Sequence, residues 1–274
     1  MKYFVVADVH GFYDKMTKAL KEAGFDRDNP EHIFVSLGDL FDRGDQAIKC
    51  LEFVMSLNPA RRILIRGNHE DLMEEAISRH RFYYHDFSNG TVDTAFQLTG
   101  AKNEFDALKG MREHYLYNQY IKSCIDFYET DNYVFVHGWI PCRSEYGTHR
   151  VNTDAENYYI TRDWYSSVLD WRAGIKDDWK RARWYNGMDA WAQGVRDEKG
   201  KIICCGHWHT SWGHYHLHNI GSEDFLNPEK PEKRAVWDVF EDKGIRAVDA
   251  CTAYSSHMNC LMLEDTDTKE EEKI

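Results

Sequence analysis

Five strand-like runs of this chain each end in a side chain that can bind a metal ion. The runs read FVVA, IFVSLG, ILIRG, YVFV and IICCG, and the residues that follow them are Asp8, Asp39, Asn68, His137 and His207. In open α/β sheets the carboxyl ends of the strands meet in one crevice, so residues far apart in sequence converge there. One such residue alone would be a surface or capping side chain. Five together predict a metal-binding crevice in an α/β fold.

The spacing of these side chains predicts two ions. Asp8 and His10 are two residues apart, so on an extended segment both project from one face and can bind the same ion. Asp39 has two carboxylate oxygens and can bridge this ion to a second one. The second ion would also bind the side chains of Asn68, His137 and His207. Such a mixed nitrogen and oxygen set suits manganese, iron or zinc.

The charge of such a centre predicts a phosphate ligand. Two divalent ions, the carboxylates of Asp8 and Asp39 and a bridging hydroxide sum to about +1. Two ions roughly 3.5 to 4 Å apart polarise phosphoryl oxygens and lower the pKa of a bridging water, whose hydroxide attacks phosphorus in line. The predicted reaction is therefore hydrolytic phosphoryl transfer to water without a covalent protein intermediate.

The hydrophobic pattern predicts one domain over residues 1–264. Strand-like runs at 3–7, 33–37 and 62–65 alternate with amphipathic helical stretches, which predicts a βαβαβ unit. Further strand-like runs occur at 133–136, 201–205, 245–248 and 261–263, where we expect mainly antiparallel pairing. Two helix-rich inserts are expected at about 80–130 and 150–193. Residues 265–274 are acidic and polar, which is typical of a flexible tail.

Composition excludes several classes of partner. The chain has 274 residues and a net charge of -12, which disfavours binding to duplex nucleic acid. The apolar run at the N-terminus stops at Asp8, too early for a signal peptide or a membrane span. The seven cysteines include no CxxC spacing, which indicates reduced thiols rather than a disulfide framework or a zinc knuckle. We therefore expect a cytoplasmic protein that binds no membrane.

Five motifs carry a family resemblance. ADVHG, GDLFDRG, GNHE, VHGW and CGHWH resemble, in this order, the signature of the calcineurin-like metallophosphoesterases, particularly the bacterial and phage branch of the serine/threonine phosphoprotein phosphatases. GDxxDRG followed by GNHE is the most specific part. The resemblance implies a central mixed β-sandwich flanked by helices in four layers, with helical inserts as a cap. It also implies a phosphatase for phosphoserine-type and phosphothreonine-type monoesters with two divalent ions, manganese being expected and iron, zinc or nickel the alternatives.

The resemblance also implies roles for individual residues. It assigns one ion to Asp8, His10 and Asp39, and the other to Asp39, Asn68, His137 and His207. His69 becomes the proton donor to the leaving group, oriented by Asp42, rather than a mere support of the ligands. Independently, an imidazole with a carboxylate partner suits a general acid.

Two arginines complete the expected site. Arg43 in DRG resembles the family's phosphate clamp, since a guanidinium can bind two phosphoryl oxygens. A second arginine is expected from the run RARWYNG, as Arg181 or Arg183, and we favour Arg183.

Three departures blur the subfamily: ADVHG replaces GDxHG, HGW replaces HGG, and CGHWH carries a second histidine. This residue, His209, either completes the shell of the first ion or has a structural or substrate-contacting role. The later run GHYHLH would place its histidines on one face of an extended segment, and we interpret them as a strand face without metal.

Five tryptophans of the second insert recur at intervals near two helical turns, at positions 164, 171, 179, 184 and 191. We interpret them as a stripe that packs a helical cap on the sheet, with a substrate platform as the alternative.

Two further functions remain open. The same centre would serve a dinucleoside polyphosphate hydrolase or a phosphodiesterase, because specificity depends on the inserts. A non-catalytic scaffold that binds a phosphorylated partner is an alternative of another class. The intact set of His69, Asp42 and Arg43 argues against the scaffold, since a degenerate binder has no need of all three. The expected substrate is a phosphoprotein or a small phosphate ester.

Overall fold

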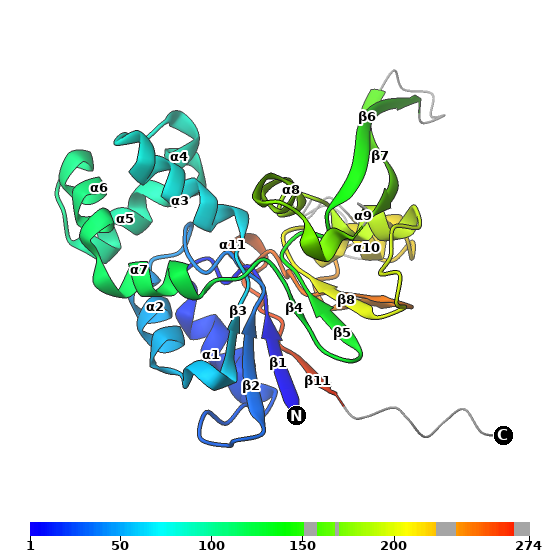
Figure 1. The fold of residues 1–274 in the computed structure, drawn as a ribbon, viewed down its shortest axis with the longest axis horizontal. Helices are drawn as coiled ribbons and strands as arrows, with labels where there is room; N and C mark the ends of the chain where they lie inside the picture. Colours follow the sequence, from blue (N-terminus) through cyan, green and yellow to red (C-terminus); the bar gives the residue numbers. More distant parts are fainter. Residues whose placement is uncertain (151–157, 168–169, 223–233, 266–274) are drawn as a thin grey trace.

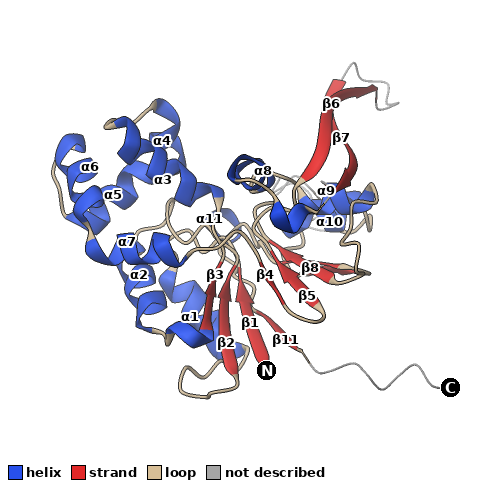
Figure 2. Cartoon of the chain, in the orientation of Figure 1, coloured by secondary structure: helices blue, strands red, loops and turns tan. Residues whose placement is uncertain are grey.

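Two β-sheets pack face to face at the centre of the fold, and helices cover the outer face of each (Figure 1, Figure 2). The structure is a computed structural model that describes residues 1–150, 158–167, 170–222 and 234–265. The resulting order of layers is helices, sheet, sheet, helices. This confirms the predicted mixed β-sandwich with flanking helices.

The first sheet comes almost entirely from the N-terminal quarter of the chain. Its order is β11-β1-β2-β3, with β1, β2 and β3 parallel and β11 antiparallel to β1. The strands are β1 (Lys2–Val6), β2 (His32–Ser36), β3 (Arg62–Leu64) and β11 (Leu261–Glu264). The elements between and after the parallel strands are α1 (Tyr13–Glu22), α2 (Ala47–Ser56), the 3-10 turn η1 (Pro59–Arg61) and α3 (Asn68–Arg79). The predicted βαβαβ unit is confirmed.

Strand β1 shows why this sheet is buried on both faces. Tyr3 and Val5 lie in the core between the two sheets, whereas Phe4 and Val6 pack under the helices. Successive side chains of a strand alternate between faces, so an uninterrupted apolar run supplies both cores.

The first insert forms a lobe of four helices beside the first sheet (Figure 1). These are α4 (Tyr84–Asn89), α5 (Thr91–Thr99), α6 (Glu104–Glu113) and α7 (Tyr115–Ser123). Helix α5 packs against α2 and α6, and α7 packs against α2. The lobe therefore continues the helical layer that covers the first sheet.

The second sheet has the order β4-β5-β8-β10-β9. Its strands are β4 (Tyr128–Glu129), β5 (Tyr133–Phe135), β8 (Ile202–Cys205), β9 (Phe240–Asp242) and β10 (Ile245–Ala247). The expected antiparallel pairing holds for β4 with β5, for β9 with β10 and for β11 with β1, but it is wrong for β5, β8 and β10, which are parallel to one another. Parallel neighbours need long crossover connections. The segment between β5 and β8 and the segment with α10 (Thr210–His216) after β8 supply them.

The second insert is only partly helical, which corrects the sequence prediction. It begins with an antiparallel ribbon of β6 (Cys142–Arg150) and β7 (Tyr158–Ser167) that projects from the molecule (Figure 1). The run YYITRDWYSS is rich in aromatic and β-branched residues, which favour strands over helices. The helical part follows as η2 (Trp171–Ala173), α8 (Lys176–Ala182) and α9 (Gly187–Ala192). Residues 266–274, where we expected a flexible tail, lie outside the described residues.

The tryptophans of this insert separate into two groups. Trp171, Trp179 and Trp191 are buried in the core over the second sheet, as the stripe predicted. Trp184 is 46% exposed and does not belong to this core. The side chain of Trp164 lies outside the described residues.

Arg172 ties the start of the second sheet to the loop before β8. Its guanidinium donates hydrogen bonds to Glu129 at 2.6 and 2.9 Å, to Asp197 at 2.7 Å and to Glu198. It also lies 4.1 Å from the centroid of the Trp171 ring. The hydrogen bond from Arg172 is the main reason that the pKa of Glu129 falls to about 2.

Substituting Arg172→Lys should lower the free energy of unfolding by about 1 to 3 kcal/mol at pH 7, because an ammonium cannot reproduce the planar fork that binds three carboxylates. Glu129 has a folded pKa below its unfolded value, so its pairing stabilises the fold above about pH 4.5 and is lost as the pH falls towards 2. In urea unfolding, the difference in free energy of unfolding between wild type and Arg172→Lys should therefore be smaller at pH 3 than at pH 7. The exposed pair of Lys180 and Glu75 provides a control, since Lys180→Met should cost less than about 1 kcal/mol.

Two further observations concern membrane-spanning helices and the cysteines. Among the described residues, no helix is both long and apolar enough to span a membrane. All seven cysteines are free thiols.

Candidate metal centre

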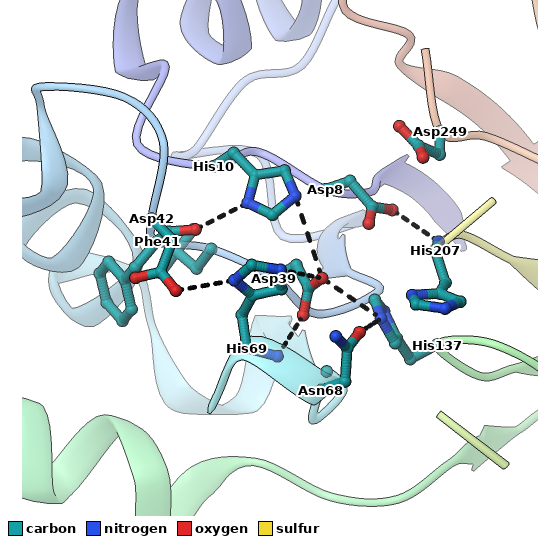
Figure 3. A network of polar contacts seen from close by, with 12 residues as sticks. Asp8, His10, Asp39, Phe41, Asp42, Asn68, His69, His137, His207 and Asp249 are labelled. Carbon is teal, nitrogen blue, oxygen red and sulfur yellow. Dashed lines mark hydrogen bonds and ion pairs between the residues drawn. The ribbon is translucent and has the colours of Figure 1, made fainter. Parts of the chain in front are cut away.

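The six predicted ligands converge at the junction of the two sheets (Figure 3). Each sits just beyond the carboxyl end of a strand or, for Asn68, at the first residue of α3. The first sheet supplies Asp8, His10, Asp39 and Asn68, and the second supplies His137 and His207. Five of them are buried to 4% exposure or less, and His207 is half-buried. The strand ends therefore bring together residues almost 200 positions apart, as the sequence predicted.

Asp39 lies at the centre of this arrangement. Its Oδ2 is 3.4 Å from Nε2 of His137 and 3.9 Å from Nε2 of both His10 and His69. Among the residues that the structure describes, two groups of side chains have ligand atoms within 4.8 Å of one another: His10, Asp39 and His69, and Asp39, His137 and His207. Asp39 belongs to both groups, so its carboxylate could contact two ions.

Backbone carbonyls orient two of the imidazoles. Nδ1 of His10 lies 2.8 Å from the carbonyl oxygen of Phe41, and Nδ1 of His137 lies 2.7 Å from that of Leu37. We assign the Nδ1 protons to these hydrogen bonds, which turns both Nε2 atoms towards Asp39 (Figure 3). Nε2 of His137 also lies 2.7 Å from Oδ1 of Asn68. The donor atoms thus converge on common points, as a metal site requires.

The backbone at the site is strained. Asp8, His10, Asp39 and His207 have φ angles between 48° and 67°, and Asp42 and Arg43 follow with 73° and 62°. Non-glycine residues pay roughly 1 kcal/mol or more for this left-handed region. Gly67 also has no room for a side chain, because a Cβ there would lie 2.1 Å from Oδ1 of Asp39. These strained conformations direct the side chains of the predicted ligands into the site.

Buried carboxylates and imidazoles crowd together at the site and shift one another's pKa values. Burial and the neighbouring Asp249 hold the pKa of Asp8 well above its ordinary range, and burial raises the pKa of Asp249 to about 6. Burial also opposes ionisation of Asp39, but His137 and His69 outweigh it and hold its pKa well below the ordinary range. Burial lowers the pKa of His207 to about 3. A neutral imidazole beside crowded carboxylates is the donor chemistry that divalent cations fit.

His69 and Asp42 form a hydrogen-bonded pair beside the ligands. Nδ1 of His69 lies 2.7 Å from Oδ2 of Asp42, and the hydroxyls of Thr91 and Thr94 donate to the same carboxylate at 2.7 Å each. Burial lowers the pKa of His69, but Asp39 and Asp42 outweigh it and raise the value above the ordinary one. The pair can therefore hold a proton on His69 and fix the ring.

A pocket of about 100 Å³ opens onto these residues. Its lining contains nine residues of the strand ends and turns and two from the inserts: Asp8, His10, Asp39, Arg43, Asn68, His69, His207, Asp249 and Cys251, with Asn89 and Trp184. Arg43 thus faces the pocket, where a clamp for phosphate is expected. Trp184 lines the pocket and does not belong to the buried stripe, as the alternative of a substrate platform would require.

Sequence reasoning assigned no role to three residues of this lining: Asn89, Asp249 and Cys251. Asn89 ends α4 and carries no motif that would have identified it. Asp249 lies after β10, as the other acids lie after their strands, and this position was the signal that could have identified it.

The structure does not place Arg183 in the pocket, which corrects our preference for it as a second phosphate ligand. Its side chain is 5% exposed and forms ion pairs with Asp71, at 2.6 Å, and with Asp126. Two carboxylates therefore already engage the guanidinium. Arg181 is bound to Asp178 on the surface of α8 and does not line the pocket either.

His209 precedes α10 and belongs to neither group of potential ligands. Its Nδ1 lies 2.6 Å from the hydroxyl oxygen of Ser211. The histidines after it are not on a strand face, because residues 210–216 form α10. His218 instead pairs with Asp242 at 3.0 Å, and Nε2 of His214 lies 3.1 Å from the carbonyl of Asp238.

Comparisons with known proteins identify the family of this chain. The family model described as calcineurin-like phosphoesterase matches residues 1–211. Serine/threonine-protein phosphatase 1 of Salmonella typhimurium is 37% identical over 27% of this chain and 32% of its own length. A symmetrical bis(5'-nucleosyl)-tetraphosphatase of Pasteurella multocida is 36% identical over 26% of this chain and 24% of its own length. The chain thus matches about a third or less of the length of these relatives.

One solved structure extends the comparison to the whole fold. A protein serine/threonine phosphatase from Saccharomyces cerevisiae aligns with a TM-score of 0.50 and 13% identity over 98% of this chain and 82% of its own. At this identity the likeness concerns the fold alone.

Proposed function

Because the chain belongs to the calcineurin-like phosphoesterase family, we propose that it is a metal-dependent phosphatase that hydrolyses phosphate monoesters of the phosphoserine and phosphothreonine type. The observation that carries this proposal is the position of Asp39, whose carboxylate belongs to both groups of potential ligands in a pocket that also contains His69 and Arg43. A scaffold that only binds phosphate would not need this combination.

The residues present fit two divalent ions. Asp8, His10 and Asp39 would hold one, and Asp39, Asn68, His137 and His207 the other. When bound, such ions supply polarisation of the phosphoryl oxygens and activation of an attacking water. Nitrogen and oxygen donors of this kind suit manganese, which we propose as the metal.

The protein's own side chains would handle the phosphate and the leaving group. Arg43 is exposed at the pocket and would bind two phosphoryl oxygens, which stabilises the charge of the transition state. His69, held by Asp42 through Nδ1, would give a proton from Nε2 to the leaving-group oxygen. The pocket of about 100 Å³ is small, so the rest of the substrate would lie outside it, over the rim.

A second candidate is hydrolysis of dinucleoside polyphosphates, and Trp184 is the observation that favours it. The residue is 46% exposed and lines the pocket, so a planar base could stack on its ring. The ring is also 5.7 Å from that of His207, at 83° to it. The Pasteurella multocida relative is named for this activity.

We also propose that the protein acts in the cytoplasm. The seven free thiols support this, because such thiols persist in reducing compartments.

A substrate panel tests the proposed function. Metal-stripped protein with added Mn²⁺ would be assayed on a phosphothreonine peptide, p-nitrophenyl phosphate, its bis ester and diadenosine tetraphosphate. We expect metal-dependent turnover, with kcat/KM for the monoesters at least about tenfold above that for the bis ester, which has one charge fewer for Arg43 and the ions to bind. Trp184→Leu should leave p-nitrophenyl phosphate hydrolysis within about threefold of wild type.

The other outcomes select the alternatives. A preference for diadenosine tetraphosphate that Trp184→Leu removes would favour the second candidate. If the protein bound phosphate but turned over no substrate with any divalent ion, the non-catalytic scaffold would be the remaining explanation.

A further inference from the structure

Glu70 ties together the two turns that carry Asp39 and Asn68. It lies at the third position of α3, is 1% exposed, and accepts the backbone N–H groups of Gly67 at 2.8 Å, Asp39 at 3.0 Å and Leu40 at 3.1 Å. A glutamate that accepts the N–H just before its own helix is half of a capping box. Here the same carboxylate also reaches across to the neighbouring strand end. One side chain therefore spans both turns.

Tyr120 donates a further hydrogen bond to this carboxylate. It lies on α7 in the helical insert, has no exposed surface, and donates its hydroxyl to Oε1 of Glu70 at 2.8 Å. Its ring also packs edge to face on Phe41, with the centroids 5.2 Å apart. The carbonyl of Phe41 in turn accepts the hydrogen bond that orients His10. Tyr120 thus contacts two supports of the site without lining the pocket.

The four hydrogen bonds divide evenly over the carboxylate. Oε2 accepts Gly67 and Asp39, and Oε1 accepts Leu40 and Tyr120. The hydroxyl is the one side-chain donor of the set, and it comes from an element that carries no predicted ligand. Loss of a hydrogen bond to a buried, charged acceptor leaves that oxygen free to turn, and the backbone groups bound to it would shift with it.

We propose that Tyr120 is a positioning residue for the metal centre, which acts through Glu70 to set the separation between Asp39 and the first turn of α3. The inference rests on the proposed metal dependence, and it gives the helical insert a role in the chemistry beyond shaping access. Partners of this kind, one step removed from the ligands, change metal affinity by about 10- to 100-fold when removed.

The test compares two tyrosines of the same helix. Tyr117 is equally buried on α7, but its hydroxyl is paired with Glu74 and the hydroxyl that Glu70 accepts is that of Tyr120. Calorimetric titration of metal-stripped protein with Mn²⁺ should show Tyr120→Phe binding about tenfold more weakly than wild type, and Tyr117→Phe within about twofold. At saturating Mn²⁺, Tyr120→Phe should lower kcat more than it changes KM. Thermal unfolding without metal shows whether either variant is simply less stable.

A double-mutant cycle tests the route through Glu70. Glu70→Gln should also weaken Mn²⁺ binding, and adding Tyr120→Phe to it should produce little further loss, because the two side chains act as one unit. Equal Mn²⁺ affinities of the two tyrosine variants would overturn the inference, as would a purely additive double mutant. The affinities of the single variants and of the double mutant are both measured as Mn²⁺ binding. Absence of phosphatase turnover would therefore refute the proposed function without affecting the inference about Tyr120.

Discussion

Asp39→Asn should reduce kcat/KM for p-nitrophenyl phosphate by about 10³-fold or more at any Mn²⁺ concentration. The reason is that Asp39 alone belongs to both groups of potential ligands, with Oδ2 between 3.4 and 3.9 Å from three imidazoles. Asparagine keeps the size and one oxygen but loses the negative charge that could be shared between two cations. Oδ1 also accepts the backbone N–H of His69 at 2.9 Å, a bond that the amide oxygen could retain. The loss should therefore be one of metal binding and not of local structure.

Calorimetry with Mn²⁺ should accompany the kinetic assay, and the stoichiometry should fall from about two ions per chain to one or fewer. Asp45→Asn is the matched control, since Asp45 is an exposed acid only six residues further along the chain. It should change kcat/KM by less than about twofold. An Asp39→Asn protein that bound two ions and kept a tenth of the activity would rule out Asp39 as a bridge.

His69→Asn should lower kcat for a phosphothreonine peptide by about 10² to 10⁴-fold, the usual range for loss of a general acid. An alkoxide is a poor leaving group and needs the proton, whereas p-nitrophenolate leaves readily without one. The loss on p-nitrophenyl phosphate should therefore be much smaller. Mn²⁺ affinity should stay near the wild-type value, because the role proposed for His69 is proton transfer from Nε2 and its Nδ1 faces Asp42.

The comparison of the two substrates makes this prediction decisive. His69 also lies close enough to His10 and Asp39 to share an ion with them. If His69→Asn lowered both activities equally and weakened Mn²⁺ binding, His69 would be a metal ligand and not the acid. His80→Asn, at the other end of α3, is the control and should have no effect on either quantity.

The sequence predicted that these side chains converge because each lies within a few residues of the carboxyl end of a strand. A strand such as β1 or β8 can be recognised from its own residues, and the position just after it is then determined in space by the sheet. Asp8 and His207 could be placed together in this way without knowing anything of the chain between them. The same rule applied to Asp249 would have added it to the site.

The features that the sequence did not predict are contacts between residues that lie far apart in the chain. Arg183 lies in the run RARWYNG, where a second phosphate-binding arginine was expected. Its guanidinium is instead bound by Asp71 and Asp126, and neither is near it in sequence. The hydroxyl of Tyr120 meets Glu70 only because the insert folds back on α3. The parallel pairing of β5 with β8 was likewise hidden, since a short apolar run does not indicate the direction of its neighbours.

The junction between the two sheets has a consequence for the stability of the protein as a whole. Four of the proposed ligands belong to the first sheet and its helices, and two belong to the second. Two bound ions would act as a staple between the halves, and by mass action their binding energy would be added to the energy that holds the sheets together. A small displacement of one half would then separate the ligands while every strand and helix stayed intact. Activity in such a molecule would depend on the relative position of the two sheets, and it would be lost before the secondary structure unfolds.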